Sequence, residues 1–225
     1  ISDNKDMTIK PTFFDSDIYM LSNEYRQENK NSSFIADVGL TKGYQSSSKD
    51  NNKNSIGHLF SKFDFDLGLI DFIDSDLKIS VEKVTNDTYL KIFESNLINT
   101  DKDIKPSNQN QLTSSAALTL NHESFNLDSG FTVYEKLDGL SSDRYEYVLP
   151  YYNFSSTNIF ENNYGNFNFS SNGSNNLKET NNLKTAVDNN FDFESNHFLT
   201  NLGLKNSFGA YYKNTNSVAK NDADY

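Results

Sequence analysis

The sequence predicts an all-β protein, an antiparallel up-and-down meander of about ten long strands. Apolar residues recur with a period of two over many stretches of the chain, which is the pattern of a strand with two different faces. Only three prolines and ten glycines are present, so few positions interrupt these stretches. Aromatic residues make up 14% of the chain, and this content favours a folded chain over a disordered one.

The strands expected in the first half of the chain begin with 7–14, which contains Pro11. In the next run the apolar face holds Phe34, Ala36, Val38 and Leu40, with Ile35 as the only exception on the polar face. The clearest run has the apolar residues Phe63, Phe65, Leu67 and Leu69. The polar residues that alternate with them are Lys62, Asp64 and Asp66, together with Gly68. A fourth run carries Leu77, Ile79 and Val81.

The second half continues the pattern. Its alternating apolar residues are Ala116, Leu118, Leu120, Phe131, Val133, Phe167, Phe169, Leu202, Leu204, Phe208, Ala210 and Tyr212. The connections are of two kinds, tight polar turns at Asp15-Ser16 and 28–30 and long polar loops at 45–55 and 99–111. Short turns that alternate with long loops, between strands of roughly 9 to 13 residues, are typical of outer-membrane barrels. We therefore expect the meander to be part of a transmembrane β-barrel.

Two other architectures fit the same alternation. A small complete barrel of about ten strands, porin-like or an enzyme scaffold, would pair its first strand with its last. A secreted β-sandwich that binds a partner would turn its apolar faces onto one another, with strands of about 5 to 6 residues. Aromatic residues near the expected strand ends, such as Phe13, Phe14, Tyr211 and Tyr212, favour the membrane barrel, because membrane interfaces enrich such rings.

Composition excludes several other classes of protein. The net charge is −11 and the Lys and Arg residues are scattered, which argues against a nucleic-acid partner. No cysteine is present, so no disulfide or thiolate metal site can form. No apolar run approaches the roughly 18 residues of a membrane helix. The three histidines lie in unrelated contexts, and no nucleotide-binding or hydrolase motif occurs, so we expect no metal, no cofactor and no enzyme activity.

Two groups of residues are the candidate functional positions. Asp64 and Asp66 share one strand face, where paired carboxylates could serve acid–base chemistry or calcium binding. The simpler interpretation is that Lys62, Asp64 and Asp66 face the wet lumen of a barrel. Pro11 removes a backbone donor from the first strand and could weaken its pairing with the strand beside it. A proline tolerated at a strand edge fits equally well.

Four landmarks, in the same order, resemble the LptD family of lipopolysaccharide-assembly proteins, most closely its alphaproteobacterial form. Residues 7–12 (MTIKPT) and 21–26 (LSNEYR) are similar to the first barrel hairpin of that family. Residues 57–60 (GHLF) lead into the clearest alternating strand, and 82–90 (EKVTNDTYL) resemble a family segment S-D-D-T-Y-L. Residues 147–154 (YVLPYYNF) resemble a V-L-P-x-x-x-Y stretch. After about residue 155 only the alternation matches.

The resemblance implies that residues 1–225 are part of the barrel domain of about twenty-six strands, without the family's N-terminal jelly-roll and last barrel strands. The implied function is to assemble lipopolysaccharide into the outer leaflet of the cell outer membrane, with no bond made or broken. Implied partners are lipopolysaccharide, outer-membrane lipids, the plug lipoprotein LptE and the periplasmic bridge protein LptA. Pro11 matches the prolines of the family's lateral seam, so we expect it at a lateral gate.

Overall fold

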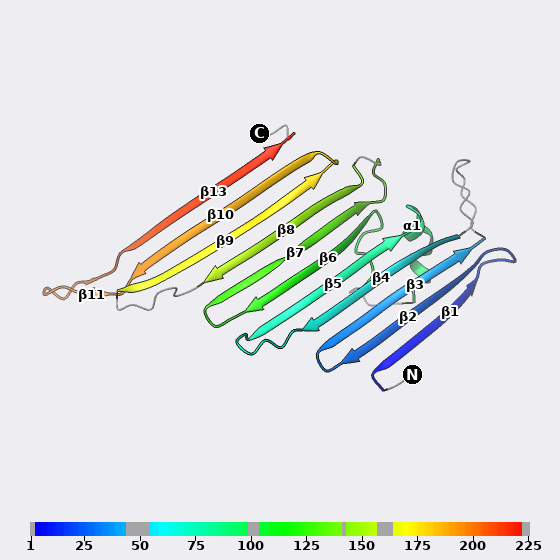
Figure 1. Ribbon diagram of the computed structural model, residues 1–225, viewed down its shortest axis with the longest axis horizontal. Coiled ribbons are helices and arrows are strands. Elements are labelled where there is room, and N and C mark those ends of the chain that lie inside the picture. Colours follow the sequence, from blue (N-terminus) through cyan, green and yellow to red (C-terminus); the bar gives the residue numbers. More distant parts are fainter. Residues whose placement is uncertain (1–2, 44–54, 99–103, 141–142, 157–163, 222–225) are drawn as a thin grey trace. The chain divides into compact units, whose positions relative to one another are not determined.

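The computed structural model describes residues 3–43, 55–98, 104–140, 143–156 and 164–221. Within these residues eleven strands form one sheet in chain order (Figure 1). They are β1 (Lys5–Phe13), β2 (Tyr19–Asn29), β3 (Ser32–Lys42), β4 (Ser55–Asp66), β5 (Asp74–Val84), β6 (Gln111–Asn121), β7 (Phe125–Lys136), β8 (Tyr145–Ser156), β9 (Gly165–Lys178), β10 (Asn182–Ser195) and β13 (Gly209–Lys220). The predicted all-β meander is confirmed.

Four short elements among the described residues stand outside this sheet. The helix α1 (Tyr89–Phe93) and the 3-10 helix η1 (Glu94–Asn96) follow β5. The strands β11 (Phe198–Leu199) and β12 (Lys205–Asn206) form a small hairpin between β10 and β13. None of the four was predicted. The alternation seen at Leu202 and Leu204 is therefore wrong as part of a long strand, because Thr200 accepts hydrogen bonds from Gly203 and Leu204 and closes a turn there.

The chain divides into two compact units, each made of three segments of the sequence. Unit 1 consists of 1–66, 77–116 and 132–146, and unit 2 consists of 67–76, 117–131 and 147–225. In unit 1 the β2–β3 turn has two residues, Lys30 and Asn31, slightly later than the predicted 28–30. The first turn was predicted at Asp15-Ser16, where the Asp15 carboxylate accepts hydrogen bonds from the backbone of Asp17 and Ile18.

The loop predicted at 45–55 lies outside the described residues except for Ser55, which begins β4. Of the loop predicted at 99–111, residues 99–103 lie outside the described residues, 104–110 are described, and Gln111 begins β6. The connection between β5 and β6 is described at 85–98 and 104–110, and its first part contains α1 and η1. Its apolar residues join a buried cluster with the strands of unit 1, made of Met20, Ile56, Phe60, Val84, Tyr89, Leu90, Phe93, Leu97, Ile104, Leu112 and Leu137. The segment after β5 thus folds back onto one face of the sheet of unit 1.

Close backbone approach between β3 and β4 requires a glycine at position 57. A Cβ atom on Gly57 would lie 2.4 Å from the carbonyl oxygen of Gly39. The substitution Gly57→Ala should therefore force the two strands apart and lower the free energy of unfolding by about 1–3 kcal/mol. Urea unfolding followed by circular dichroism measures this change. Ser61→Ala, on the same strand and face, is the control, and equal loss in both variants would contradict the prediction.

Candidate functional site

The two faces of the sheet in unit 1 have different chemistry. On β2, β3 and β4 one face carries Met20, Ser22, Glu24, Asp37, Thr41, Ile56, His58 and Phe60, all of which are buried. We call this the covered face, because the segment that contains α1 lies on it and α1 contacts β4. Buried polar groups among apolar ones on a single face are costly unless they are hydrogen-bonded. The covered face is therefore the candidate functional site.

A chain of hydrogen bonds links the covered face to α1. The two ring nitrogens of His58 lie 3.0 Å from Asp37 Oδ1 and 2.7 Å from the Tyr89 hydroxyl. Gly39, opposite His58 on β3, makes room for the ring, since a Cβ atom there would lie 2.3 Å from His58 Cε1. Burial raises the pKa of the Tyr89 hydroxyl far above its ordinary value, so this group stays protonated and available for hydrogen bonding.

A second carboxylate lies directly opposite Asp37. Glu24 on β2 pairs with Asp37 in the β2–β3 register, and Glu24 Oε1 binds Arg26 Nε at 2.7 Å. The side chains of Glu24 and Asp37 are only 4% and 1% exposed. The remaining carboxylate oxygens, Glu24 Oε2 and Asp37 Oδ2, have no hydrogen-bond partner. Each carboxylate of this pair thus has one partner, Arg26 for Glu24 and His58 for Asp37.

Ion pairs hold the start of the covering segment, and a single long hydrogen bond contacts its other side. Asp87, just before α1, binds Arg144 Nη2 at 2.7 Å, and Arg144 Nε also binds Glu135 Oε1 at 2.8 Å. The bond to Asp87 raises the pKa of the Arg144 guanidinium, which stays charged. Glu135 in turn accepts a hydrogen bond from Lys83 Nζ at 2.7 Å. Beyond η1, Lys10 Nζ on β1 donates to the Asn96 carbonyl at 3.4 Å.

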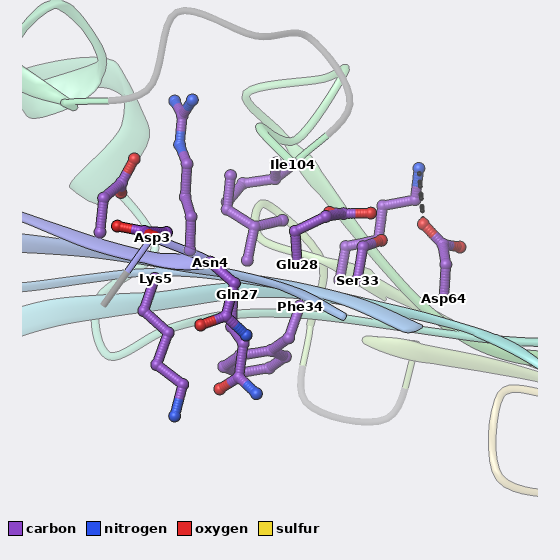
Figure 2. Close-up of a pocket in the computed structure, with 13 residues that line it drawn as sticks. Asp3, Asn4, Lys5, Gln27, Glu28, Ser33, Phe34, Asp64 and Ile104 are labelled. Atoms are coloured by element: carbon purple, nitrogen blue, oxygen red, sulfur yellow. Dashed lines mark ion pairs between the residues drawn. The ribbon is translucent and has the colours of Figure 1, made fainter. Parts of the chain in front are cut away.

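A polar pocket of about 550 Å³ opens beside the buried carboxylates. Figure 2 shows Glu28, Ser33, Asp64 and Ile104 on one side of the strands and Lys5, Gln27 and Phe34 on the other. Arg26 and Lys62 also line it. Arg26 lines this pocket and also binds Glu24. The pocket therefore lies next to the buried pair of Glu24 and Asp37.

Two of the three predicted lumen residues come together in this pocket. Lys62 Nζ and Asp64 Oδ2 lie 3.5 Å apart, each about one third exposed, and Figure 2 marks their ion pair. They share the polar face of β4 with His58 and Phe60, as the alternation indicated. Asp66, the last residue of β4, is exposed and does not line the pocket. Asp64 thus has Lys62 as its ion-pair partner on the same strand.

Pro11 lies on the opposite, apolar face, in the edge strand β1 and opposite Leu21. The Phe14 amide donates to the Ile18 carbonyl and the Glu28 amide to the Asn4 carbonyl. Hydrogen-bonded pairs alternate along an antiparallel ladder, so the even-numbered residues of β1 bond to β2 and the odd-numbered ones point their backbone groups away from it. At position 11 any residue other than proline would therefore point its backbone N–H away from β2, to the outer edge of β1.

The face opposite the covered face is apolar and exposed in unit 1. We call it the uncovered face. Its exposed large side chains are Met7, Ile9, Phe13, Tyr19, Leu21, Val38, Leu40, Leu59 and Phe65. A single exposed apolar residue needs no explanation, but a contiguous set over four strands marks a surface that meets lipid or another apolar partner.

Unit 2 carries a row of aromatic rings across its strands. Neighbouring rings lie 4.7–6.0 Å apart between centroids. In order they are Phe72, Phe125, Phe154, Phe169, Phe191 and Tyr212. Further along the same face, polar and apolar residues are mixed. Ser171 bonds to Asn189 at 2.8 Å, while Leu183 pairs with Leu177 and Val187 with Gly173.

Sequence reasoning missed α1, the buried pair Glu24 and Asp37, and the aromatic row. A helical signal exists, since Tyr89, Leu90 and Phe93 have helical spacing and the Asn86 side chain accepts a hydrogen bond from the Thr88 backbone. The pair and the row depend on register between strands, which alternation within one strand does not contain.

Neither a protein-family model nor a curated protein matches this chain. In the described part of the chain, no three His, Asp or Glu side chains are arranged around a common metal position. No helix among the described residues is long and apolar enough to cross a membrane.

The hydroxyl of Tyr89 should stabilise the fold through His58. At neutral pH, Tyr89→Phe leaves a buried ring nitrogen without its partner and should lower the free energy of unfolding by about 1–3 kcal/mol. Because burial raises the pKa of Tyr89 in the folded state only, wild-type stability should fall as the pH rises above 10.0, the ordinary tyrosine value, and the difference between the two proteins should shrink.

Denaturant unfolding at a series of pH values measures both effects. Tyr19→Phe is the matched control, because this tyrosine is 42% exposed on the uncovered face. A Tyr89→Phe protein as stable as the control, or a difference that grows above pH 10.0, would contradict the role given to this hydroxyl.

Proposed function

We propose that this chain forms part of an outer-membrane β-barrel, and that the barrel is a lipopolysaccharide translocon with no enzyme activity. The observation that carries the membrane part is the contrast of faces in unit 1. The uncovered face presents exposed apolar side chains from four neighbouring strands, while the covered face buries both polar and apolar side chains against the chain's own segment. A barrel with lipid outside and a polar lumen requires this contrast.

Strand length supports the membrane barrel. The long strands have 9 to 14 residues. A strand of 11 residues at about 3.4 Å per residue is about 37 Å long, and at a tilt of about 40° it covers about 28 Å, close to the hydrocarbon thickness.

Aromatic rows support it as well. In unit 2 one ring from each of several strands contributes to the row from Phe72 to Tyr212. In unit 1, Tyr25 and Phe34 lie 6.1 Å apart, and Phe34 pairs with Phe63 in the β3–β4 register. Membrane barrels carry such girdles where the hydrocarbon meets the polar headgroups.

The strand number favours a larger barrel over a small autonomous one. In an up-and-down meander neighbouring strands are antiparallel, so the first and the eleventh run in the same direction. Closing these eleven described strands on themselves would need a parallel pair, whereas bacterial single-chain barrels have even numbers of antiparallel strands. The sandwich alternative is disfavoured in unit 1, because its apolar face is exposed rather than packed on a second sheet.

The lipopolysaccharide part of the proposal rests on the resemblance to the LptD family. The landmark segments fall on β1, β2, β4, the end of β5 with α1, and β8. Under this proposal Lys62, Asp64 and Asp66 belong to the lumen side, the first-strand seam opens laterally at Pro11, and LptE and LptA are the protein partners. A proline whose missing donor belongs to the outer edge of β1 weakens the seam without weakening the β1–β2 ladder.

Single-cysteine labelling tests the membrane location, since the chain has no cysteine of its own. The full chain, folded into phospholipid vesicles, would carry an environment-sensitive dye at Val38→Cys on the uncovered face. Brominated lipids should quench this dye strongly. Lys62→Cys, on the covered face, is the control and should be quenched little. A protein that stays soluble without detergent and whose Val38→Cys dye is not quenched would support the sandwich instead.

Replacing Pro11 tests the seam. Pro11→Ala restores one outward backbone donor, and one net hydrogen bond of about 1 kcal/mol should make seam opening about five-fold less favourable. In cells that depend on the variant, labelled lipopolysaccharide should reach the surface more slowly at an unchanged level of barrel. Ile9→Ala, at another outward-pointing position of β1, should have little effect. If labelled lipopolysaccharide reaches the surface of Pro11→Ala cells at an unchanged rate, Pro11 has no role in a lateral gate.

A further inference from the structure

The β11–β12 hairpin of unit 2 exposes a group of large apolar side chains. It lies beyond the ends of β10 and β13, the two long strands that it connects (Figure 1). In the connection 196–208, five apolar side chains are between 50% and 87% exposed, namely Phe198, Leu199, Leu202, Leu204 and Phe208. A contiguous exposed group of this kind marks a surface that meets a membrane or another partner.

Hydrogen bonds give this hairpin a defined shape. Its two short strands pair in antiparallel register. At its tip the Thr200 carbonyl accepts a hydrogen bond from the Gly203 amide at 2.9 Å, and Gly203 has a φ of +78°, a conformation that favours glycine. Leu202, within this turn, is 87% exposed. An ordered element thus presents the apolar side chains, so their burial in a partner costs little additional backbone entropy.

The hairpin continues the aromatic row of unit 2. Phe191 belongs to this row, and two residues further along β10 the Phe193 ring lies 5.7 Å from the Phe208 ring. Phe208 directly precedes β13 and ends the connection that carries the hairpin. Asp192 and Glu194 alternate with these rings on β10, and so lie on the opposite face. The apolar surface therefore extends from the row to the hairpin, with the two carboxylates on the other side.

The charge of this part of the chain favours an anionic partner. From Glu194 to Asp222 the intervening residues include no Asp or Glu but three lysines, Lys205, Lys213 and Lys220, although the whole chain has a net charge of −11. Lys205 lies in the hairpin itself, on β12. Exposed apolar side chains together with basic ones are the combination that binds at the surface of an anionic membrane. An uncharged protein surface would not require this local excess of positive charge.

We propose that the β11–β12 hairpin inserts its apolar side chains into the headgroup region of an anionic phospholipid leaflet, beside the aromatic row. This inference rests on the proposed membrane barrel, of which the row would be a girdle. Short turns such as 122–124 lie at the same end of the meander, and in bacterial barrels such turns face the periplasm, where the adjoining leaflet consists of phospholipid. The inserted hairpin fixes the depth of β10 and β13 in the bilayer.

Dye quenching in vesicles of phosphatidylcholine and phosphatidylglycerol tests the hairpin. The full chain, folded into these vesicles, carries an environment-sensitive dye at Leu202→Cys. Lipids brominated near the headgroup should quench this dye more than lipids brominated near the chain ends, because interfacial segments lie only about 5–10 Å deep. Thr180→Cys, in the exposed turn between β9 and β10 of the same unit, is the control, and neither lipid should quench its dye.

Replacing Lys205 tests the choice of an anionic lipid. In the Leu202→Cys protein, Lys205→Gln should shift the equilibrium of the hairpin between bilayer and water about five-fold toward water when the vesicles contain phosphatidylglycerol. In vesicles of phosphatidylcholine alone, Lys205→Gln should change nothing. The quenched fraction of the dye measures this equilibrium. If Lys205→Gln leaves the quenching unchanged in both kinds of vesicle, anionic lipid is not the partner.

The dye at Val38→Cys separates this inference from the proposed function. Quenching at Val38→Cys without quenching at Leu202→Cys would overturn the role of the hairpin and leave the membrane barrel standing, and the apolar side chains would then belong to a protein partner. Quenching at Leu202→Cys alone would support the hairpin as a membrane contact and overturn the barrel. Quenching at neither position would overturn both proposals.

Discussion

The register between β2, β3 and β4 is the constraint on which unit 1 depends. It sets Glu24 opposite Asp37 and Gly39 opposite His58, beneath the hydroxyl of Tyr89. A slip of one residue would turn every side chain of a strand to the other face. Val38 and Leu40 would then lie on the covered face, and Asp37 would lie on the uncovered face. The buried hydrogen-bond chain therefore specifies the register, and the register in turn creates the two faces.

On β3 and β4 alternation predicted which side chains share a face, and the sheet order was expected because neighbouring strands in a meander pair in sequence. Even the exception is informative. Ile35 lies on the covered face among polar neighbours, and there it packs against the buried apolar cluster. The helix α1 escaped prediction because it has only five residues and its apolar spacing lies inside a long polar connection. Tertiary burial of Tyr89, Leu90 and Phe93, rather than local propensity, stabilises so short a helix.

The candidate site could be predicted only in part, because the register between β2 and β3 depends on the position of the turn that joins them. A two-residue turn at Lys30 and Asn31 pairs residue 24 with residue 37, whereas a turn centred on Asn29 would pair Asp37 with Leu21. The sequence placed the turn at 28–30, so the buried carboxylate pair could not be derived. Lys62 and Asp64 needed no register, since their proximity follows from a spacing of two on one strand. Contacts within one strand can thus be predicted from the sequence, whereas contacts between strands can be predicted only when the turn geometry is known.

The buried cluster ends at β2, and this has a consequence for the proposed seam. Eight of the nine residues of β1 are exposed, and the two strands next to it carry the buried side chains. Besides its ladder with β2, β1 contacts the covering segment through a hydrogen bond of 3.4 Å from an exposed lysine, which contributes little stability, and Phe14 just after β1 lies 5.5 Å from the Phe93 ring. Displacing the outer edge of β1 would therefore leave Glu24, Asp37 and His58 in place. In a barrel whose seam opens at Pro11, the cost of opening would lie in the seam hydrogen bonds alone, since the buried core behind β2 would remain intact.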